Sequence, residues 1–250
     1  MEAWERYFVK ELEIVQKVRD TQVENIKKGA ELIADCYEKG GIVRIFGCGH
    51  SHLISEDVFW RAATLGNVHA ILEPSVSGMS EITKAGNVES LEGYGQMIVD
   101  YHKVQTPDIM ICISNSGNKA VAIDVARTCQ ERGIPTIVMT NVAYSEYLKP
   151  KHSTGKKLKD FGDVVISNCS EIGDSAMEIE GFDIPVGSTS SIPFLFIQNS
   201  MFAYAVELLV KRGIQPDVYL NGSLKANFAD RVNSHNGYIV DKYHSRIRNL

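Results

Sequence analysis

Two clusters of glycine and serine residues could bind a negatively charged group. The first reads G-C-G-H-S-H at 47–52 and the second reads S-N-S-G-N at 114–118. Backbone N–H groups and hydroxyls in such loops bind oxyanions, and glycine lets the backbone approach the anion closely. Neither cluster contains lysine or arginine, so we expect neutral donors that suit a phosphate monoester on a small polar molecule. The candidate ligands are Gly49, His50, Ser51, Ser114, Asn115, Ser116, Gly117 and Asn118.

Each cluster follows an apolar strand and precedes a helix. Strands are predicted at 42–46 and 108–113, and the helices that follow at 51–65 and 120–132. Because the carboxyl ends of parallel strands meet at one edge of a sheet, the two loops would face one crevice. The alternative for these serines is an ordinary turn or N-cap role. A dinucleotide-binding loop does not fit, since G-x-G-x-x-G requires glycine where Leu53 stands.

Strands and helices alternate along the rest of the chain with short connections. Further strands are predicted at 67–72, 134–140 and 163–167, with helices at 90–102 and 191–210. The spans 75–87 and 141–162 read as loops, and a lysine of the second loop could reach a phosphate. This alternation predicts an α/β fold, a three-layer α-β-α sandwich around a five-stranded, mostly parallel sheet. We expect one domain over residues 1–250.

The two ends of the chain flank a core that spans about 30–213. Residues 4–38 predict helix in two segments, with an apolar stripe that includes Trp4, Phe8 and Leu12. That stripe must be covered, either across the domain or by a second subunit. The polar tail, 215–250, is rich in asparagine and contains His235. The tail either folds over the site or lies solvated at the periphery, and the sequence favours neither reading.

Composition excludes several classes of partner. Apolar residues make up 44% and charged residues 23%, as in soluble globular proteins. A net charge of −5 argues against nucleic acid or an anionic membrane as the main partner. The five cysteines have no C-x-x-C spacing and read as reduced residues of a cytoplasmic protein. Pro193, Gln198 and Glu207 interrupt the most apolar helix, which indicates a core or interface helix rather than a membrane span.

The motifs G-C-G-H-S and I-S-N-S-G, each after a strand, resemble the sugar isomerase (SIS) domain family, which includes phosphoheptose isomerase and N-acetylmuramic acid 6-phosphate etherase. More narrowly, G-H-S-H-L-x-x-E-D and the S-H-N of the tail resemble a bacterial SIS subgroup of the UPF0309 type. The resemblance implies a flavodoxin-like, Rossmann-like fold, a sugar phosphate as ligand, a homodimer and no cofactor. The resemblance also adds the turn at 186–192 to the candidate site. Without the resemblance, this turn would be interpreted as the N-cap of the helix that follows. The candidate phosphate ligands there are Ser188, Thr189 and Ser190.

Aldose–ketose isomerisation needs a base that moves a proton between C1 and C2. The candidates for proton transfer are Glu81, Glu92, His52 and His235, since a neutral imidazole exchanges protons readily near pH 7. Where the isomerase and etherase relatives carry a catalytic glutamate, this chain has Arg61, which cannot act as a base at neutral pH. His50, His52 and Glu56 are too poorly spaced to favour a metal site, so we expect no metal.

Three functions therefore remain open. The first is an isomerase for a phosphorylated sugar. The second is a lyase or etherase that acts on an amino-sugar phosphate. The third is a non-catalytic sensor that binds a phosphorylated sugar in the same crevice and acts through a protein partner.

Overall fold

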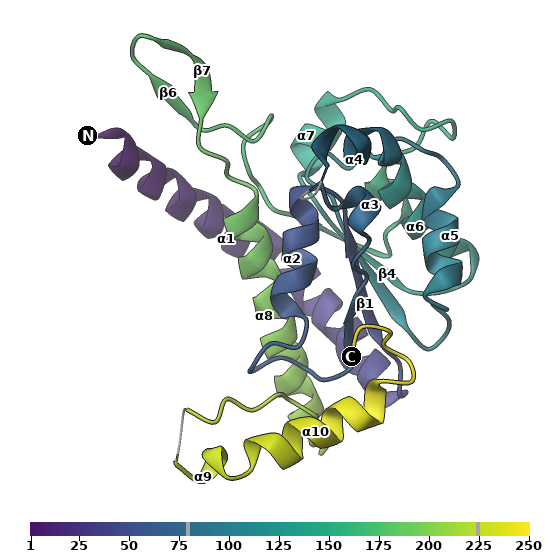
Figure 1. Ribbon diagram of the computed structural model, residues 1–250. Coiled ribbons are helices and arrows are strands. Elements are labelled where there is room, and N and C mark those ends of the chain that lie inside the picture. Colours follow the sequence, from purple (N-terminus) through teal and green to yellow (C-terminus); the bar gives the residue numbers. More distant parts are fainter. Residues whose placement is uncertain (79–80, 224–225) are drawn as a thin grey trace.

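The computed structural model describes residues 1–78, 81–223 and 226–250 (Figure 1). Its centre is a sheet of five parallel strands in the order β2-β1-β3-β4-β5. Every residue of β1, β3 and β4 is buried, as expected for parallel strands that are covered on both faces. The predicted α/β fold is confirmed. The strands are β1 Val43–Gly47, β2 Val68–Ala70, β3 Ile109–Ile113, β4 Thr136–Thr140 and β5 Val164–Ser167.

Successive side chains of the strands face two helical layers, which makes three layers in all. Ile109, Ile111 and Ile113 of β3 pack with residues of α1, α2 and α8 in one core cluster. Met110 and Cys112 pack with residues of α5 and α6 in a second cluster on the opposite face. These helices are α1 Ala3–Glu38, α2 His50–Val58, α5 Tyr94–Tyr101, α6 Ala120–Glu131 and α8 Ser191–Lys211.

Two helices differ in length from the sequence prediction. The N-terminal helix α1 is continuous over 36 residues rather than divided into two segments. The helix after the first loop ends at Val58, because Phe59 is extended and Trp60 has a φ of 48°. Arg61 therefore lies beyond the end of α2, where it is exposed and pairs with Asp57 at 2.7 Å.

The spans predicted as loops contain short helices. Residues 75–87 include parts of α3 (Pro74–Ser77) and α4 (Ile82–Val88). The following helix, α5, begins at Tyr94 because Gly93 adopts a left-handed φ of 86° before it. The span 141–162 contains α7 (Val142–Tyr147) and the short 3₁₀ helix η1 (Leu158–Phe161).

An antiparallel hairpin, β6 (Met177–Ile179) with β7 (Phe182–Val186), was not predicted from the sequence. The hairpin and the N-terminal end of α1 both stand out from the body of the molecule (Figure 1). All five residues of β7 are exposed. The region therefore presents apolar side chains that the chain itself does not cover.

The C-terminal tail contains α9 (Ala226–Ala229) and α10 (Val232–Tyr243) and packs against the chain rather than lying free. Ile239 and Tyr243 of α10 are buried in a small cluster with Ile42. Arg246 binds Asp108 at 2.5 Å, at the start of β3. The tail is thus fixed close to the amino-terminal ends of the strands.

Helix α8 is long and apolar enough to cross a membrane by length and composition alone. It packs instead against α1 and α2, and Phe194, Ile197 and Met201 are buried in the core. Of the residues in its most apolar stretch, 44% are buried inside the structure.

Candidate functional site

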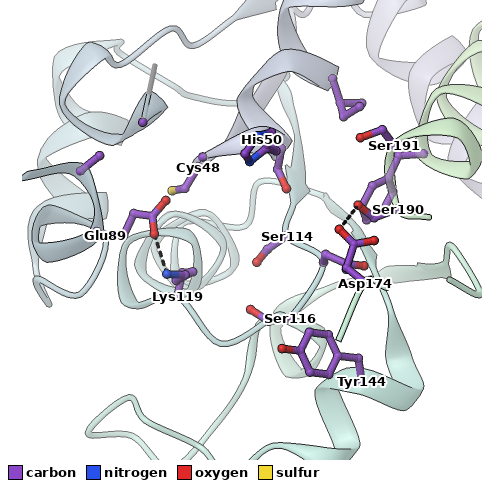
Figure 2. A pocket seen from close by; sticks show the side chains of 18 of the residues that line it. Cys48, His50, Glu89, Ser114, Ser116, Lys119, Tyr144, Asp174, Ser190 and Ser191 are labelled. Carbon is purple, nitrogen blue, oxygen red and sulfur yellow. Dashed lines mark hydrogen bonds and ion pairs between the residues drawn. The ribbon is translucent and has the colours of Figure 1, made fainter. Parts of the chain in front are cut away.

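The two predicted loops line one cavity of about 390 Å³ at the carboxyl end of the sheet (Figure 2). Cys48 to Ser51 follow β1, and Ser114 to Ser116 follow β3, its neighbour in the sheet. The cavity thus lies in the crevice outside the strand ends, where ligands bind in open α/β sheets. The polar residues of its lining are His50, Ser51, Glu89, Ser114, Asn115, Ser116, Lys119, Tyr144, Asp174, Ser190 and Ser191.

The first loop is held against α3. Gly49 has a φ of 55° and donates its N–H to the carbonyl of Val76 at 2.8 Å. The N–H of Ser51 is also used, by the carbonyl of Cys48 at 3.1 Å. The Ser51 hydroxyl, by contrast, has no hydrogen-bond partner among the described residues. Burial, with the nearby Glu89 carboxylate, raises the pKa of the Cys48 thiol, so this cysteine is not a reactive thiolate at neutral pH.

In the second loop, two serines face the cavity while the asparagines hold the backbone. The side-chain oxygen of Asn115 accepts hydrogen bonds from Asn168 at 3.0 Å and from Ser170 at 3.2 Å. The Asn118 amide donates to the carbonyl of Lys149 at 2.8 Å, outside the cavity lining. Ser114 is a buried residue that lines the cavity, and its hydroxyl, like that of Ser51, has no partner among the residues described.

Gly117 also lies outside the lining of the cavity. Its φ is 59°, and a side chain there would come within 2.9 Å of the Thr140 hydroxyl oxygen. Gly117 therefore shapes the turn, together with Asn118, whereas Ser114 and Ser116 line the cavity.

Only Ser190 of the third predicted cluster lines the cavity. Its hydroxyl donates to Asp174 at 2.9 Å, and the N–H of Thr189 donates to the other oxygen of the same carboxylate at 2.9 Å. Thr189 is fully buried, and Ser188 is exposed with its carbonyl bound to Tyr7. The carboxylate of Asp174 therefore competes with any ligand for the Ser190 hydroxyl.

An ion pair that was not predicted from the sequence, between a buried glutamate and a partly exposed lysine, lies opposite Asp174 in the cavity (Figure 2). Glu89, at the end of α4, is only 6% exposed, and its carboxylate is 2.6 Å from the ammonium of Lys119. Lys119 is the N-cap residue of α6, directly after the second loop. The cavity lining thus adds a cation to the neutral donors expected from the sequence, and this cation is paired with Glu89.

No signal in the sequence marked Glu89. It lies next to a span predicted as loop, and it reaches the cavity only because α4 packs across the first loop. A side chain built at Gly49 would lie 3.2 Å from the Glu89 carboxylate. Lys119 could have been considered from its place beside the serine loop, at the start of a predicted helix.

None of the four predicted catalytic residues lines this cavity. Glu81 occupies the N-cap position of α4 without a capping hydrogen bond from its side chain, and it pairs with Lys84 at 3.6 Å. His52 is buried beneath the loop, where it bonds Glu56 at 2.8 Å. His235 lies on α10, close to the amino-terminal edge of the sheet, and contacts the carbonyl of Val218 at 2.9 Å. No described residue of the tail lines the cavity either.

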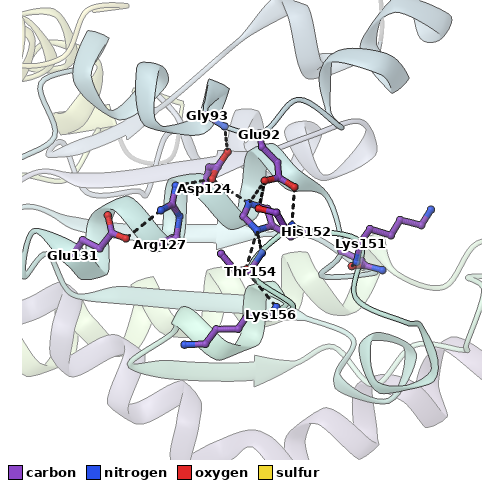
Figure 3. A network of polar contacts seen from close by, with 11 residues as sticks. Glu92, Gly93, Asp124, Arg127, Glu131, Lys151, His152, Thr154 and Lys156 are labelled. Carbon is purple, nitrogen blue, oxygen red and sulfur yellow. Dashed lines mark hydrogen bonds and ion pairs between the residues drawn. The ribbon is translucent and has the colours of Figure 1, made fainter.

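Glu92 lies in a separate polar network that also contains His152 and Asp124 (Figure 3). Its carboxylate accepts the N–H of Ser153 at 2.7 Å and also binds the Ser153 hydroxyl. These hydrogen bonds lower the pKa of Glu92. The network fixes the loop after α7, so Glu92 acts here as a structural residue of that loop.

Among the described residues, no group of three or more histidine, cysteine, aspartate or glutamate side chains could hold a metal ion. His50 and His52 both lie in the first turn of α2, where His52 is bonded to Glu56 while His50 lines the cavity.

A family model for the SIS domain matches residues 6–141. A UPF0309 protein of Listeria monocytogenes serotype 4b is 33% identical over 234 residues, which are 94% of this chain and 93% of that protein. The chain therefore belongs to the SIS-domain family. Within that family it is similar to UPF0309 proteins over nearly its whole length, so the predicted resemblance is confirmed.

Solved structures show the same fold at low sequence identity. Phosphoheptose isomerase from Neisseria gonorrhoeae has a TM-score of 0.54 at 19% identity, over 80% of this chain and 95% of that chain. The sugar isomerase domain of an RpiR transcription factor from Sphaerobacter thermophilus has a TM-score of 0.51 at 16% identity. The match covers 82% of this chain and 90% of that chain. One of these neighbours is an enzyme and the other a regulator, so the fold by itself does not decide between catalysis and sensing.

Proposed function

We propose that the cavity binds a phosphorylated sugar and that the protein is an isomerase of the phosphoheptose isomerase type. The proposal rests on two serine hydroxyls without partners among the described residues, Ser51 and Ser114, in one cavity with the ion pair of the buried Glu89 and Lys119. The hydroxyls bind the phosphate together with Ser116 and the start of α6. Lys119 adds the charge that makes such hydrogen bonds strong.

Glu89 is the residue we assign to the proton transfer between carbons. Its carboxylate removes the proton from C2 of the open-chain aldose, the C2–H electrons form the C1–C2 double bond of an enediolate, and the same group returns the proton to C1. The Lys119 ammonium stabilises the negative charge that develops on the sugar oxygen. A second proton must move between the two oxygens, and His50 and Asp174 line the cavity for that step.

Replacement of Glu89 tests this assignment. In D2O, the wild-type protein incubated with a panel of aldose phosphates would exchange the C2 proton and form the ketose, followed by NMR. Glu89→Gln keeps the shape of the side chain but cannot accept the proton, so exchange and turnover should both be lost while sugar phosphate binding remains. Glu92→Gln, outside the cavity, is the matched control and should retain both. Unchanged exchange in Glu89→Gln would refute the role of Glu89.

Sensing without turnover is the second candidate, and one observation favours it. The Glu89 carboxylate already binds the Lys119 ammonium at 2.6 Å, so it is engaged within the protein rather than free to approach a carbon atom of the sugar. A sensor would bind the sugar phosphate but catalyse no proton exchange in the NMR experiment. An etherase or lyase would instead release a leaving group from an amino-sugar phosphate in the same assay.

We also propose that the protein is a cytoplasmic homodimer. The stripe on α1 predicted to need a cover is exposed at Trp4, Phe8 and Leu12. Phe182 and Ile184 of the hairpin are exposed beside it. A second copy of the chain would cover both. All five cysteines are free thiols, as the cytoplasm favours.

A further inference from the structure

A second cavity, of about 630 Å³, lies between α5 and the end of the C-terminal tail. It shares no residue with the first cavity, and none of its residues has a role in the proposed isomerisation. Its volume is in the range of small-molecule sites. One wall is apolar and aromatic, from Leu72, Met97 and Tyr101. The polar lining consists of His69, Glu73, Tyr94, His102, Arg248 and Asn249.

Arg248 brings an unmatched positive charge to this cavity. Its guanidinium lies 4.2 Å from the centre of the Tyr101 ring and makes no ion pair with any described residue. The tail that carries it is fixed on both sides, because Arg246 binds Asp108 and Asn249 donates to the carbonyl of Ala70 at 3.0 Å. The cation is therefore held at the cavity by the fold rather than displayed on a loose terminus.

His69 supplies a hydrogen-bond donor to the same cavity lining. Its Nδ1 contacts the guanidinium of Arg44, which can only donate, so Nδ1 accepts and the proton is on Nε2. Burial and the charge of Arg44 lower the pKa of His69 to about 2, so the ring is neutral. Nε2 is buried and has no partner in the part of the chain that the structure describes. An unpaired buried donor is costly, and a ligand atom would satisfy it.

The acidic residue of the cavity already has partners. One oxygen of Glu73 binds His102 Nε2 at 3.2 Å, and the other accepts from the Tyr94 hydroxyl at 3.4 Å. Of the two charged side chains in the lining, only Arg248 has no hydrogen bond or ion pair to a described residue, and it lies beside the aromatic wall. We propose that this cavity is a second ligand site, for a small organic molecule with a planar or apolar body and one phosphate or carboxylate group.

The position of Glu73 connects this site to the first cavity. Glu73 is the N-cap residue of α3. The carbonyl of Val76, in the same helix, accepts a hydrogen bond from the N–H of Gly49 at 2.8 Å. Gly78, at the end of α3, lines the first cavity. A ligand that moves Glu73 would move α3 and so the first loop. Binding at the second site should therefore change the affinity of the first cavity for a sugar phosphate. This consequence rests on the proposed function.

Benzoate and phenyl phosphate are suitable probes, because they share one planar body and differ in the oxyanion. Calorimetric titration of the full-length protein should show binding of one or both, and no binding of uncharged benzyl alcohol. The stronger probe identifies the oxyanion. Arg248→Gln should weaken binding roughly tenfold or more, the usual loss when a charge-assisted hydrogen bond is removed. Met97→Glu, which places a negative charge on the exposed wall, should weaken binding without touching the tail.

One control locates the binding. Arg61→Gln removes an exposed arginine outside the cavity and should leave the affinity for both probes unchanged. Absence of binding of both probes at millimolar concentration would overturn the proposal. Binding that survives both Arg248→Gln and Met97→Glu would overturn it too, because the probes would then bind elsewhere.

The connection between the sites is tested by titration of a sugar phosphate with and without saturating probe. A changed affinity in the wild type, lost in Arg248→Gln, is the expected result. An unchanged sugar phosphate affinity would refute the connection while the second site stands. If no sugar phosphate binds at all, the proposed function of the first cavity fails, and the probe titrations still decide the second site.

Discussion

At the scale of residues, Ser114 combines burial with a hydroxyl that has no partner among the described residues. In the empty cavity such a hydroxyl can form its hydrogen bonds with water. It forms a stronger hydrogen bond when a ligand brings a charged acceptor. Asn115 and Asn118 differ from it, because their amides are used within the protein to hold the loop. This division of roles within five consecutive residues separates ligand binding from loop stability.

Replacement of Ser114 should therefore affect binding far more than folding. Ser114→Ala removes a hydrogen bond to a charged oxygen, worth about 1.5–3 kcal/mol, so the sugar phosphate affinity should fall by roughly ten- to a hundredfold. Calorimetric titration measures this loss, and thermal unfolding should show little change. Ser234→Ala, on exposed α10, is the control. If the two variants bound equally well, Ser114 would not be a phosphate ligand.

The serines were predictable and the ion pair was not, for a physical reason. Ser51, Ser114 and Ser116 follow apolar strands directly, so the local sequence places them at the sheet edge. Glu89 and Lys119 come from different helices, and they meet only through the packing of α4 near the start of α6. His235 failed to reach the cavity for the converse reason, since the tail packs at the other edge of the sheet.

At the scale of elements, α5 and α6 pack at unusually close range. A side chain at Gly95 of α5 would collide with the Val121 carbonyl and come within 2.6 Å of Asp124 Cβ. Both are rigid parts of α6. Gly95→Ala should therefore lower the free energy of unfolding by about 1–3 kcal/mol despite the better helix propensity of alanine.

Chemical denaturation measures the effect of Gly95→Ala. Gly237→Ala, in α10, is a matched control, because nothing lies within 4 Å of the added methyl group. In Gly237→Ala, the free energy of unfolding should stay unchanged or rise by up to about 1 kcal/mol. A stabilised Gly95→Ala variant would show that α5 does not pack on α6 as described.

The C-terminal tail is held by Asp217, which should give the protein a dependence on acid pH. Burial by itself would raise the pKa of Asp217, but hydrogen bonds from Lys242, Tyr243 and Tyr37 outweigh it, and the net pKa is lowered. A carboxyl group with a lowered pKa in the folded state contributes stability above its unfolded pKa of 3.8 and loses it as the pH falls through the folded value.

Asp217→Asn should thus destabilise the protein at pH 7 by about 1–3 kcal/mol, since charged hydrogen bonds are lost. The difference from the wild type should shrink below roughly pH 4, where the wild-type carboxyl becomes protonated. Denaturation at a series of pH values provides the test. A difference that stayed constant down to pH 2 would contradict this role of the Asp217 charge.

The sequence predicted the five strands of the sheet and missed the hairpin and the short helices. The five strands carry apolar runs because both of their faces are covered. The hairpin strand β7 reads F-D-I-P-V and is exposed throughout, so no burial pattern marked it. The short helices α3 and α4 lie in a span rich in glycine and serine, where local propensity indicates loop.

At the scale of the whole molecule, the uncovered apolar side chains of α1 and β7 are the feature that the single chain does not explain. Trp4 and Phe8 are 66% and 61% exposed, and Ile184 is 64% exposed. Monomeric proteins rarely expose a contiguous apolar patch of this kind. A dimer that buries both elements would explain it.

Phe8→Glu should therefore dissociate the dimer, because a charge would be buried at the interface. Sedimentation equilibrium should give twice the chain mass for the wild type and one chain mass for the variant. Lys28→Glu, elsewhere on α1, should leave the dimer intact. A wild-type protein that sedimented as a monomer would contradict the proposal.

The central claim is that the cavity between the two serine loops binds a phosphorylated sugar. Calorimetric titration with a panel of sugar phosphates and their unphosphorylated parents tests it most directly. The account predicts saturable binding of at least one phosphorylated sugar, no binding of its parent, and loss of binding in the double variant Ser114→Ala, Ser116→Ala. Equal binding of parent and phosphate, or binding that persists in the double variant, would contradict it.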